Sequence, residues 1–188
     1  LIPCGTELLR VRVLNTHLQW LGQRLPDSCH TLSRQVPVPD TGQAIREAVQ
    51  TALGRAGLVI TTGGLGPTSD DITCGLIADL LARPLCRDDS IASHIESFFE
   101  RRNRPMPESV LVQAQVPKGA AVFPNEHGTA PGLAIEVSPN TFHESGKPAW
   151  LLMLPGPPRE LRPMGDDPAL PFIKKHLPLE QAFHWRKP

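Results

Sequence analysis

The sequence predicts an α/β fold, because short apolar runs typical of strands alternate with segments of helical periodicity along most of the chain. The clearest unit joins a buried strand at 58–62 to a helix from about Asp70 through a glycine-rich turn. Strand, turn and helix make half of a βαβ unit, the usual connection between parallel strands. Many of the 21 prolines lie in loops and mark the ends of the elements.

The composition is that of a globular protein and excludes several function classes. The 188 residues suffice for one domain with a real core, and 40% of them are hydrophobic. Lys plus Arg and Asp plus Glu both number 19, so we expect no nucleic-acid partner. No apolar run is long enough for a membrane span and no signal peptide is visible, which indicates a cytoplasmic protein without a membrane partner. The 4 cysteines form no Cys-x-x-Cys pair, so neither zinc nor a disulfide framework is predicted.

The first third of the chain is predicted to hold two helices separated by a strand. Residues 1–3 have the character of a strand end, and a helix begins near Asn15 or Thr16, either of which can cap it. Residues 30–36 are predicted to be a strand, and an apolar stripe over 44–53 predicts an amphipathic helix. The candidate core positions of the first helix are Leu18, Leu21 and Leu25.

The remainder of the chain continues the alternation. After the helix from Asp70, the pattern predicts a helix over 88–102, strands at 133–137 and 149–154, and a helix that opens near Pro158. The helical period over 88–102 is marked by Ile91, Ile95, Phe98 and Phe99. Three arginines follow, at positions 101, 102 and 104, and we assign them to the helix dipole rather than to a phosphate site.

The glycine-rich turn combines groups that suit a phosphate ligand. Its glycines, between 63 and 66, permit positive φ and let a ligand approach the main-chain N–H groups. Thr68 or Ser69 can cap the following helix, whose free N–H groups favour an anion. Asp70 and Asp71 then place carboxylates beside an anion site, a conflict that a divalent cation such as Mg²⁺ resolves. The alternative is that these acidic residues only favour the first helical turn through the macrodipole.

Another acidic residue, Asp40, follows the strand predicted at 30–36 and precedes the helix over 44–53. One interpretation is that it caps this helix. The other is that it belongs to a ligand site.

Three later stretches resemble the molybdopterin-binding-like superfamily, which includes the MogA/MoaB proteins and the N-terminal domain of CinA-type competence/damage-inducible proteins. The Leu-Gly-Pro-Thr wording and double Asp of 65–71 are closer to CinA than to MogA. Residues 113–132 resemble the CinA signature Gln-Ala, Pro-x-Gly-Ala, Asn-x-x-Gly-Thr-Ala-Pro-Gly almost word for word, and MogA and MoaB chains lack most of it. Residues 154–160 resemble the superfamily's Leu-Pro-Gly-x-Pro-x-Glu, although they could equally form only a structural turn.

A fourth block, near the start of the chain, resembles the family pattern but departs from it in three places. Thr6 stands where Asp is commonest, Val11 where Gly is usual, and His17 where Asn is usual. We expect His17, at a helix start, to be a solvated or capping residue rather than a catalyst. The positions that match are Gly5, Glu7, Leu8, Leu9, Arg12, Asn15 and Thr16.

The resemblance implies a three-layer α/β/α sandwich around a mostly parallel sheet, of the MogA/MoaB-like kind. It implies a single domain over 1–188, with its core at about 5–164 and no room for the C-terminal nicotinamide-nucleotide amidase domain that CinA chains often carry. It also implies a homo-oligomer, either a dimer or a trimer.

The function implied by the resemblance is metal-dependent hydrolysis of a nucleotide diphosphate linkage, of the ADP-ribose pyrophosphatase type. Asp40 and Asp71 would converge from neighbouring strand ends as catalytic carboxylates, while Asp70 and Asp71 would hold Mg²⁺ or a similar divalent cation. The residues expected to bind the nucleotide or its phosphates are Glu7, Asn15, Thr62, Gly63, Gly64, Gly66, Thr68, Ser69, Asn125, Gly128, Thr129, Pro131, Gly132, Pro155, Gly156, Pro158 and Glu160.

Two other functions remain open on the sequence. One is a molybdopterin-binding or adenylyl-transferring protein of molybdenum cofactor biosynthesis, with molybdopterin as its ligand. The other is a non-catalytic nucleotide-binding regulatory module, which the departures at Thr6, Val11 and His17 favour. In every case the expected partner is a small-molecule nucleotide or pterin.

Overall fold

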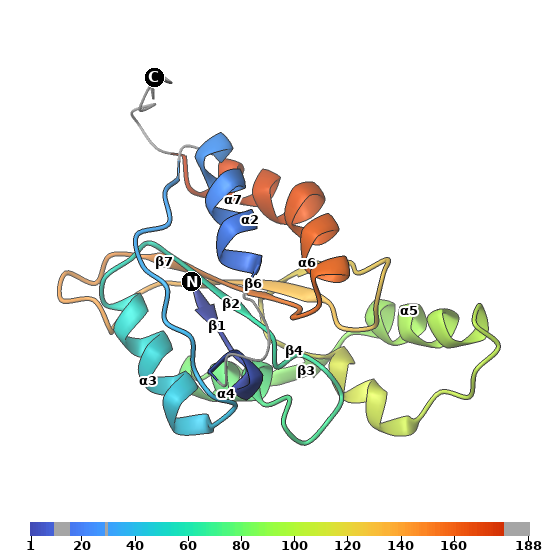
Figure 1. Ribbon diagram of the computed structural model, residues 1–188. Helices are drawn as coiled ribbons and strands as arrows, with labels where there is room; N and C mark the ends of the chain where they lie inside the picture. Colours follow the sequence, from blue (N-terminus) through green and yellow to red (C-terminus); the bar gives the residue numbers. More distant parts are fainter. Residues whose placement is uncertain (10–15, 29, 179–188) are drawn as a thin grey trace.

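A computed structural model describes residues 1–9, 16–28 and 30–178 and shows a central sheet between layers of helices (Figure 1). This sheet has five strands in the spatial order β1-β2-β7-β6-β5. They are β1 (Ile2–Pro3), β2 (Leu58–Thr62), β5 (Ala121–Phe123), β6 (Gly132–Val137) and β7 (Ala149–Leu154). A separate two-stranded sheet pairs β3 (Leu85–Arg87) with β4 (Gln115–Pro117).

The central sheet is mixed, with one parallel and one antiparallel half. β1 pairs with β2, and β2 with β7, in parallel, so that Ile60 lies opposite Leu152. β7, β6 and β5 are antiparallel, and Ala134 of β6 lies opposite the same Leu152. The parallel half brings the carboxyl ends of β1, β2 and β7 to one edge, which is where open α/β sheets bind ligands.

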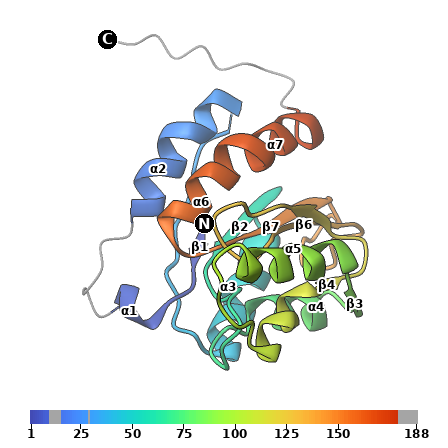
Figure 2. The same cartoon turned by 90° about the vertical axis from the view of Figure 1, so that its right-hand side faces the viewer.

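Helices cover both faces of the sheet, so the predicted three-layer α/β/α sandwich is confirmed (Figures 1 and 2). One face carries α2 (Thr16–Arg24), α6 (Pro158–Met164) and α7 (Leu170–His176), with the π-helical turn Gly165–Ala169 joining the last two. The other carries α3 (Gly42–Leu53), α4 (Thr73–Leu80), α5 (Asp89–Glu100) and the 3₁₀ segment η2 (Glu108–Ala114). The short α1 (Thr6–Leu9) and η1 (Leu25–Ser28) complete the described elements. None of the described helices is long and apolar enough to cross a membrane.

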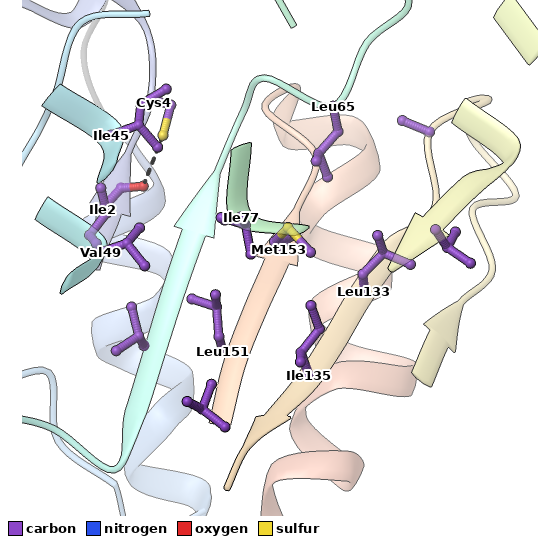
Figure 3. Close-up of a cluster of buried hydrophobic side chains, with 14 of the residues drawn as sticks. Ile2, Cys4, Ile45, Val49, Leu65, Ile77, Leu133, Ile135, Leu151 and Met153 are labelled. Carbon is purple, nitrogen blue, oxygen red and sulfur yellow. Dashed lines mark hydrogen bonds between the residues drawn. The ribbon is translucent and has the colours of Figure 1, made fainter. Parts of the chain in front are cut away.

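The inner strands are buried on both faces, which explains their continuous apolar runs. Leu151 and Met153 of β7 point into the cluster under α3 and α4, together with Leu133 and Ile135 of β6 (Figure 3). The intervening Leu152 packs into the second cluster, under α2, α6 and α7. Successive side chains of a strand alternate between faces, so one strand supplies both cores.

Residues 30–36 form no regular strand, contrary to the prediction. The chain nevertheless runs beside β1, because the N–H of Val36 donates to the carbonyl of Leu1 and that of Val38 to the carbonyl of Pro3. Cys4 and Val38 form an isolated parallel bridge. Pro37 and Pro39 have no N–H to offer on the outer side, which limits this segment to a sheet edge.

Two expectations about the helices were wrong. Leu18 is 40% exposed rather than in the core, because α2 buries the stripe formed by His17 and Leu21, four residues apart, which Leu25 of η1 continues. Helix α4 begins at Thr73, three residues after Asp70. Helix α3 buries Ile45, Val49 and Leu53, as its periodicity predicted.

Candidate functional site

A cavity of about 620 Å³ opens at the carboxyl ends of the three parallel strands. The loop after β1, the glycine turn after β2 and the turn after β7 form one part of its wall. The loop 128–130 approaches from the β5–β6 connection, and Phe98 of α5 and Gln113 of η2 also reach the cavity. The cavity therefore lies where open α/β sheets usually bind their ligands, outside the carboxyl ends of the parallel strands.

The glycine turn has the conformation that its composition predicted. Gly63 and Gly64 have φ of 92° and 68°, in the left-handed region that favours glycine. A Cβ on Gly63 would lie 2.5 Å from the carbonyl oxygen of Cys4, and one on Gly64 would lie 2.0 Å from Thr73 Oγ1. Both glycines are therefore needed for the packing of the turn against β1 and α4.

Three consecutive main-chain N–H groups of this turn have no hydrogen-bond acceptor among the described residues. Gly63 is not among them, because its N–H donates to the carbonyl of Leu154. The N–H groups of Gly64, Leu65 and Gly66 donate no hydrogen bond within the part of the chain that the structure describes. Leu65 thus takes the place of Gly63 among the three donors predicted from the sequence.

Asp71 holds the end of the turn instead of starting the helix. Its Oδ2 accepts hydrogen bonds from the N–H of Thr68 at 3.0 Å and from Thr68 Oγ1 at 2.6 Å. Helix α4 follows Ile72, with no side-chain cap, so the prediction that Thr68 or Ser69 caps it was wrong. Such local bonds compete with helix formation, which explains the late start of α4. A Cβ on Gly66 would lie 2.3 Å from Asp71 Oδ2, so this carboxylate lies directly over the glycine.

Asp40 is not the cap of α3, since the N-cap residue is Thr41. Its Oδ2 accepts a hydrogen bond from the N–H of Thr6 at 2.8 Å, and its own N–H donates to Thr6 Oγ1 at 3.3 Å. The threonine that replaces the usual Asp of the family pattern therefore holds Asp40 beside the cavity. Asp40 and Asp71 line the same cavity, as the resemblance implied.

Glu160 is the fourth carboxylate of the described wall, after Asp40, Asp70 and Asp71. It is only 8% exposed, and its Oε2 accepts a hydrogen bond from Asn125 Nδ2 at 2.9 Å. A Cβ on Gly128 would lie 2.2 Å from the same oxygen, so the glycine leaves the space in which the carboxylate lies.

Asn125 supports the wall rather than forming it. Besides Glu160, its Nδ2 donates to the carbonyl of Ala130, and its Oδ1 accepts from the N–H of His127. At 3% exposed it does not line the cavity, contrary to its predicted contact with a nucleotide. It fixes the position of Glu160 relative to the 125–130 loop.

Most of the other predicted binding residues line the cavity, and some do not. Those brought together are Thr62, Gly63, Gly64, Gly66, Asp70, Gly128, Thr129, Pro155, Gly156 and Pro158. Thr68, Ser69, Pro131 and Gly132 are not part of the wall. A Cβ on Gly132 would lie 2.3 Å from Met164 Sδ, so this glycine serves the packing of β6 against α6. The side chain of Glu7 and all of Val11, Arg12 and Asn15 lie outside the described residues.

A family model described as a probable molybdopterin binding domain matches residues 1–175. The chain belongs to this family. Its curated relatives include a CinA-like protein of Akkermansia muciniphila, 42% identical over 174 residues, and a putative competence-damage inducible protein of Caldicellulosiruptor bescii, 45% identical over 175 residues. Each alignment covers 93% of this chain and 40% of the relative, so the chain spans less than half of their length.

Among solved structures, this family member is compared with a CinA protein and with a MoaB protein. The crystal structure of CinA from Thermoplasma acidophilum matches with a TM-score of 0.74 and 28% identity, over 93% of this chain and 94% of that chain. MoaB from Thermus thermophilus matches with a TM-score of 0.56 and 17% identity, over 92% and 87%, which shows a shared fold alone. The predicted resemblance to CinA within the MogA/MoaB-like superfamily is confirmed.

Several wall residues of this molybdopterin-binding domain were missed by the sequence reasoning. His17, expected to be solvated or capping, is 8% exposed and lines the cavity. Burial lowers the pKa of His17, although a main-chain hydrogen bond at Gly156 opposes the effect. Phe98, Gln113 and Arg159 also line the cavity. In the sequence, Phe98 indicated only the periodicity of a helix. Gln113 and Arg159 lie inside stretches that resemble the family, and this position could have marked them as candidate site residues.

Cys4 lines the same cavity but is not a candidate nucleophile. Burial raises the pKa of its thiol to about 12. Since the thiolate is the reactive form, this cysteine is inert near neutral pH.

Proposed function

We propose that this domain binds a nucleotide through its diphosphate in the cavity at the ends of β1, β2 and β7, and hydrolyses the diphosphate linkage with the help of a divalent cation. The observation that carries the proposal is the meeting, in one cavity, of the open N–H groups of Gly64–Gly66 with the carboxylates of Asp40, Asp70 and Asp71. Water added across the P–O–P bond of ADP-ribose gives AMP and ribose 5-phosphate.

The charge of the cavity supports a cation in the complex. Its described wall carries four carboxylates, and Arg159 is the one Lys or Arg side chain among the residues that form it. The Arg159 side chain is 80% exposed, so its charge is well solvated. A diphosphate brings further negative charge, and a divalent cation would offset the repulsion.

The donor set suits magnesium that arrives with its phosphate ligand. Within the described residues, no group of three or more His, Cys, Asp or Glu side chains is placed to hold a metal ion. Magnesium typically needs one or two carboxylates, with substrate phosphates and water supplying the other oxygens. Asp70 is exposed, and the Oδ1 atom of Asp71 accepts no hydrogen bond within the described chain, so these two would hold it. The cation would neutralise charge on the phosphate oxygens and polarise the attacking water.

The protein's own groups have separate tasks in this proposal. The N–H groups of Gly64, Leu65 and Gly66 hold the phosphate oxygens and stabilise the charge that develops on them. Asp40, oriented by Thr6, is placed to accept a proton from water. Glu160, braced by Asn125, accepts hydrogen bonds from the ribose hydroxyls.

The family description favours a second candidate, binding of a molybdopterin in the same cavity. Incubation with ADP-ribose and Mg²⁺ or Co²⁺ separates the candidates. Release of AMP and ribose 5-phosphate supports hydrolysis, whereas tight binding without turnover supports a regulatory module. If molybdopterin raises the melting temperature and ADP-ribose does not, the second candidate replaces the first.

The role of Asp71 gives a direct mutational test. We predict that Asp71→Asn lowers turnover of ADP-ribose by about 100-fold or more, because it removes a charge beside the reacting phosphate. Asn keeps an oxygen that accepts the Thr68 hydrogen bonds, so the fold is preserved. Asp79→Asn is the matched control, since Asp79 is exposed on α4 and does not line the cavity. Turnover that is equal in both variants would remove Asp71 from the mechanism.

A further inference from the structure

Phe98 is the one phenyl ring in the described wall of the cavity. It lies on α5, which is outside every sequence block that resembles the family. The ring is half-buried, so part of it is offered to the cavity. No step of the proposed hydrolysis uses it.

Neighbouring side chains hold this ring in place. The guanidinium carbon of Arg102 lies 3.5 Å from the ring centroid, over one face of the ring. Phe99 packs edge-on against it at 6.1 Å between centroids. One turn earlier, His94 Nε2 lies 3.2 Å from the carbonyl oxygen of Gly128, which fastens α5 to the loop that borders Glu160. What remains available to a ligand is the uncovered part of a fixed aromatic surface.

A second wall residue, Gln113, carries a hydrogen-bonding atom without a partner. Its Nε2 donates to the carbonyl of Leu65 at 3.0 Å, which fixes the orientation of the amide. Its Oε1 is then an acceptor, and this buried atom has no hydrogen-bond partner in the described structure. The side chain is 8% exposed and borders the cavity. A buried acceptor without a donor is costly, and a ligand that supplies an N–H removes the cost.

These two residues lie on segments that pack together, α5 and η2, at one end of the molecule (Figure 1). A ring surface and an unpaired acceptor together suit a planar heterocycle that bears an amino group. Neither phosphate nor ribose satisfies both requirements, because neither has an aromatic face, although the ribose hydroxyls can donate hydrogen bonds. We propose that Phe98 and Gln113 form the heterocycle subsite of the cavity, in which an amino-bearing base such as adenine stacks on Phe98 and donates to Gln113 Oε1.

This subsite rests on the proposed function for the placement of the phosphates, and its test does not require turnover. Isothermal titration calorimetry in Mg²⁺ would compare AMP, purine riboside 5′-monophosphate, which lacks the amino group, and ribose 5-phosphate, which lacks the base. We expect AMP to bind about tenfold more tightly than the purine analogue, because only AMP satisfies Gln113. Phe98→Leu should lower the affinity for AMP by about tenfold and leave the affinity for ribose 5-phosphate unchanged.

The matched control is Phe142→Leu, because Phe142 is also half-buried, packs against the core and does not line the cavity. This variant should bind AMP as the wild-type protein does. Equal affinities for AMP and the purine analogue, or AMP binding unchanged by Phe98→Leu, would overturn the subsite even if ADP-ribose is hydrolysed. Conversely, AMP bound with these preferences but no turnover of ADP-ribose would refute the hydrolysis and keep the subsite.

Discussion

At the scale of single residues, the glycine turn shows how a ligand loop also serves the packing of the fold. Gly64 has a positive φ, and its missing side chain leaves room for the buried hydroxyl of Thr73. The same residue offers an N–H group that no described atom uses. A substitution there therefore affects both stability and ligand binding.

Gly64→Ala is expected to lower the free energy of unfolding by at least about 2 kcal/mol, since it combines a left-handed backbone with a clash against Thr73. Gly75→Ala is the matched control, because a Cβ there would meet no atom within 4 Å beyond the neighbouring residues and backbone of its own helix in the described structure, and the residue is inside α4. This second change should stabilise the protein by about 0.5–1 kcal/mol. Urea unfolding of both variants measures the difference, and equal stabilities would contradict the role assigned to Gly64.

Residue type alone did not reveal which polar side chains reach the cavity. Asn125 stands in a matching block and was predicted to bind the ligand, but its amide is used up by Glu160, Ala130 and His127. His17 was expected to be a solvated or capping residue and lies buried in the wall. The difference arises because hydrogen bonds between distant segments decide these positions, and a single sequence does not show such pairs.

At the scale of elements, helix α5 connects the fold to the proposed base subsite. Its N-cap is Asp88, whose Oδ1 accepts hydrogen bonds from the N–H groups of Ser90 at 2.9 Å and Ile91 at 3.2 Å. Hydrogen bonds from the Ser90 hydroxyl and from the N–H of Ile91 lower the pKa of Asp88 below its ordinary value of 3.8. The ionised cap therefore stabilises α5.

Asp88→Ala is expected to cost about 1 kcal/mol of stability at neutral pH, the usual value of a lost N-cap. Asp89→Ala is the control, because the Asp89 side chain is 91% exposed and its ion pair within the described chain is with the exposed Arg87. Since the folded pKa of Asp88 is depressed, its contribution is present above pH 3.8 and is lost as the pH falls through the folded value. Chemical unfolding should therefore show a smaller difference in stability between the wild type and Asp88→Ala at pH 3 than at pH 7. A constant difference between wild type and Asp88→Ala would contradict it.

The helices and strands with the clearest local sequence patterns were predicted most accurately. The strand β2 was predicted over its full extent, because its apolar β-branched run is bounded by glycines. The strand expected at 30–36 did not form, because β1, the strand beside this segment in the described chain, is only two residues long. The start of α4 was misplaced because Asp71 bonds back to Thr68, an interaction that helix periodicity does not register.

At the scale of the whole molecule, the sequence was sufficient to predict the layers of the fold and the edge of the sheet at which the cavity lies. Alternating strand and helix patterns predicted an α/β fold, and the family resemblance implied the sandwich. The strand order brings Asp40, Asp71 and the glycine turn to one cavity. What could not be predicted was the antiparallel half of the sheet and the approach of α5 and η2, which depend on contacts between distant segments.

The central claim is that a diphosphate lies on the glycine turn between the acidic side chains. A crystal structure of the protein with Mg²⁺ and a non-hydrolysable methylene analogue of ADP-ribose tests it most directly. We expect diphosphate oxygens within hydrogen-bond distance of the N–H groups of Gly64, Leu65 and Gly66, with the cation on Asp70 and Asp71. A diphosphate bound elsewhere on the molecule, with this turn and these carboxylates untouched, would contradict it.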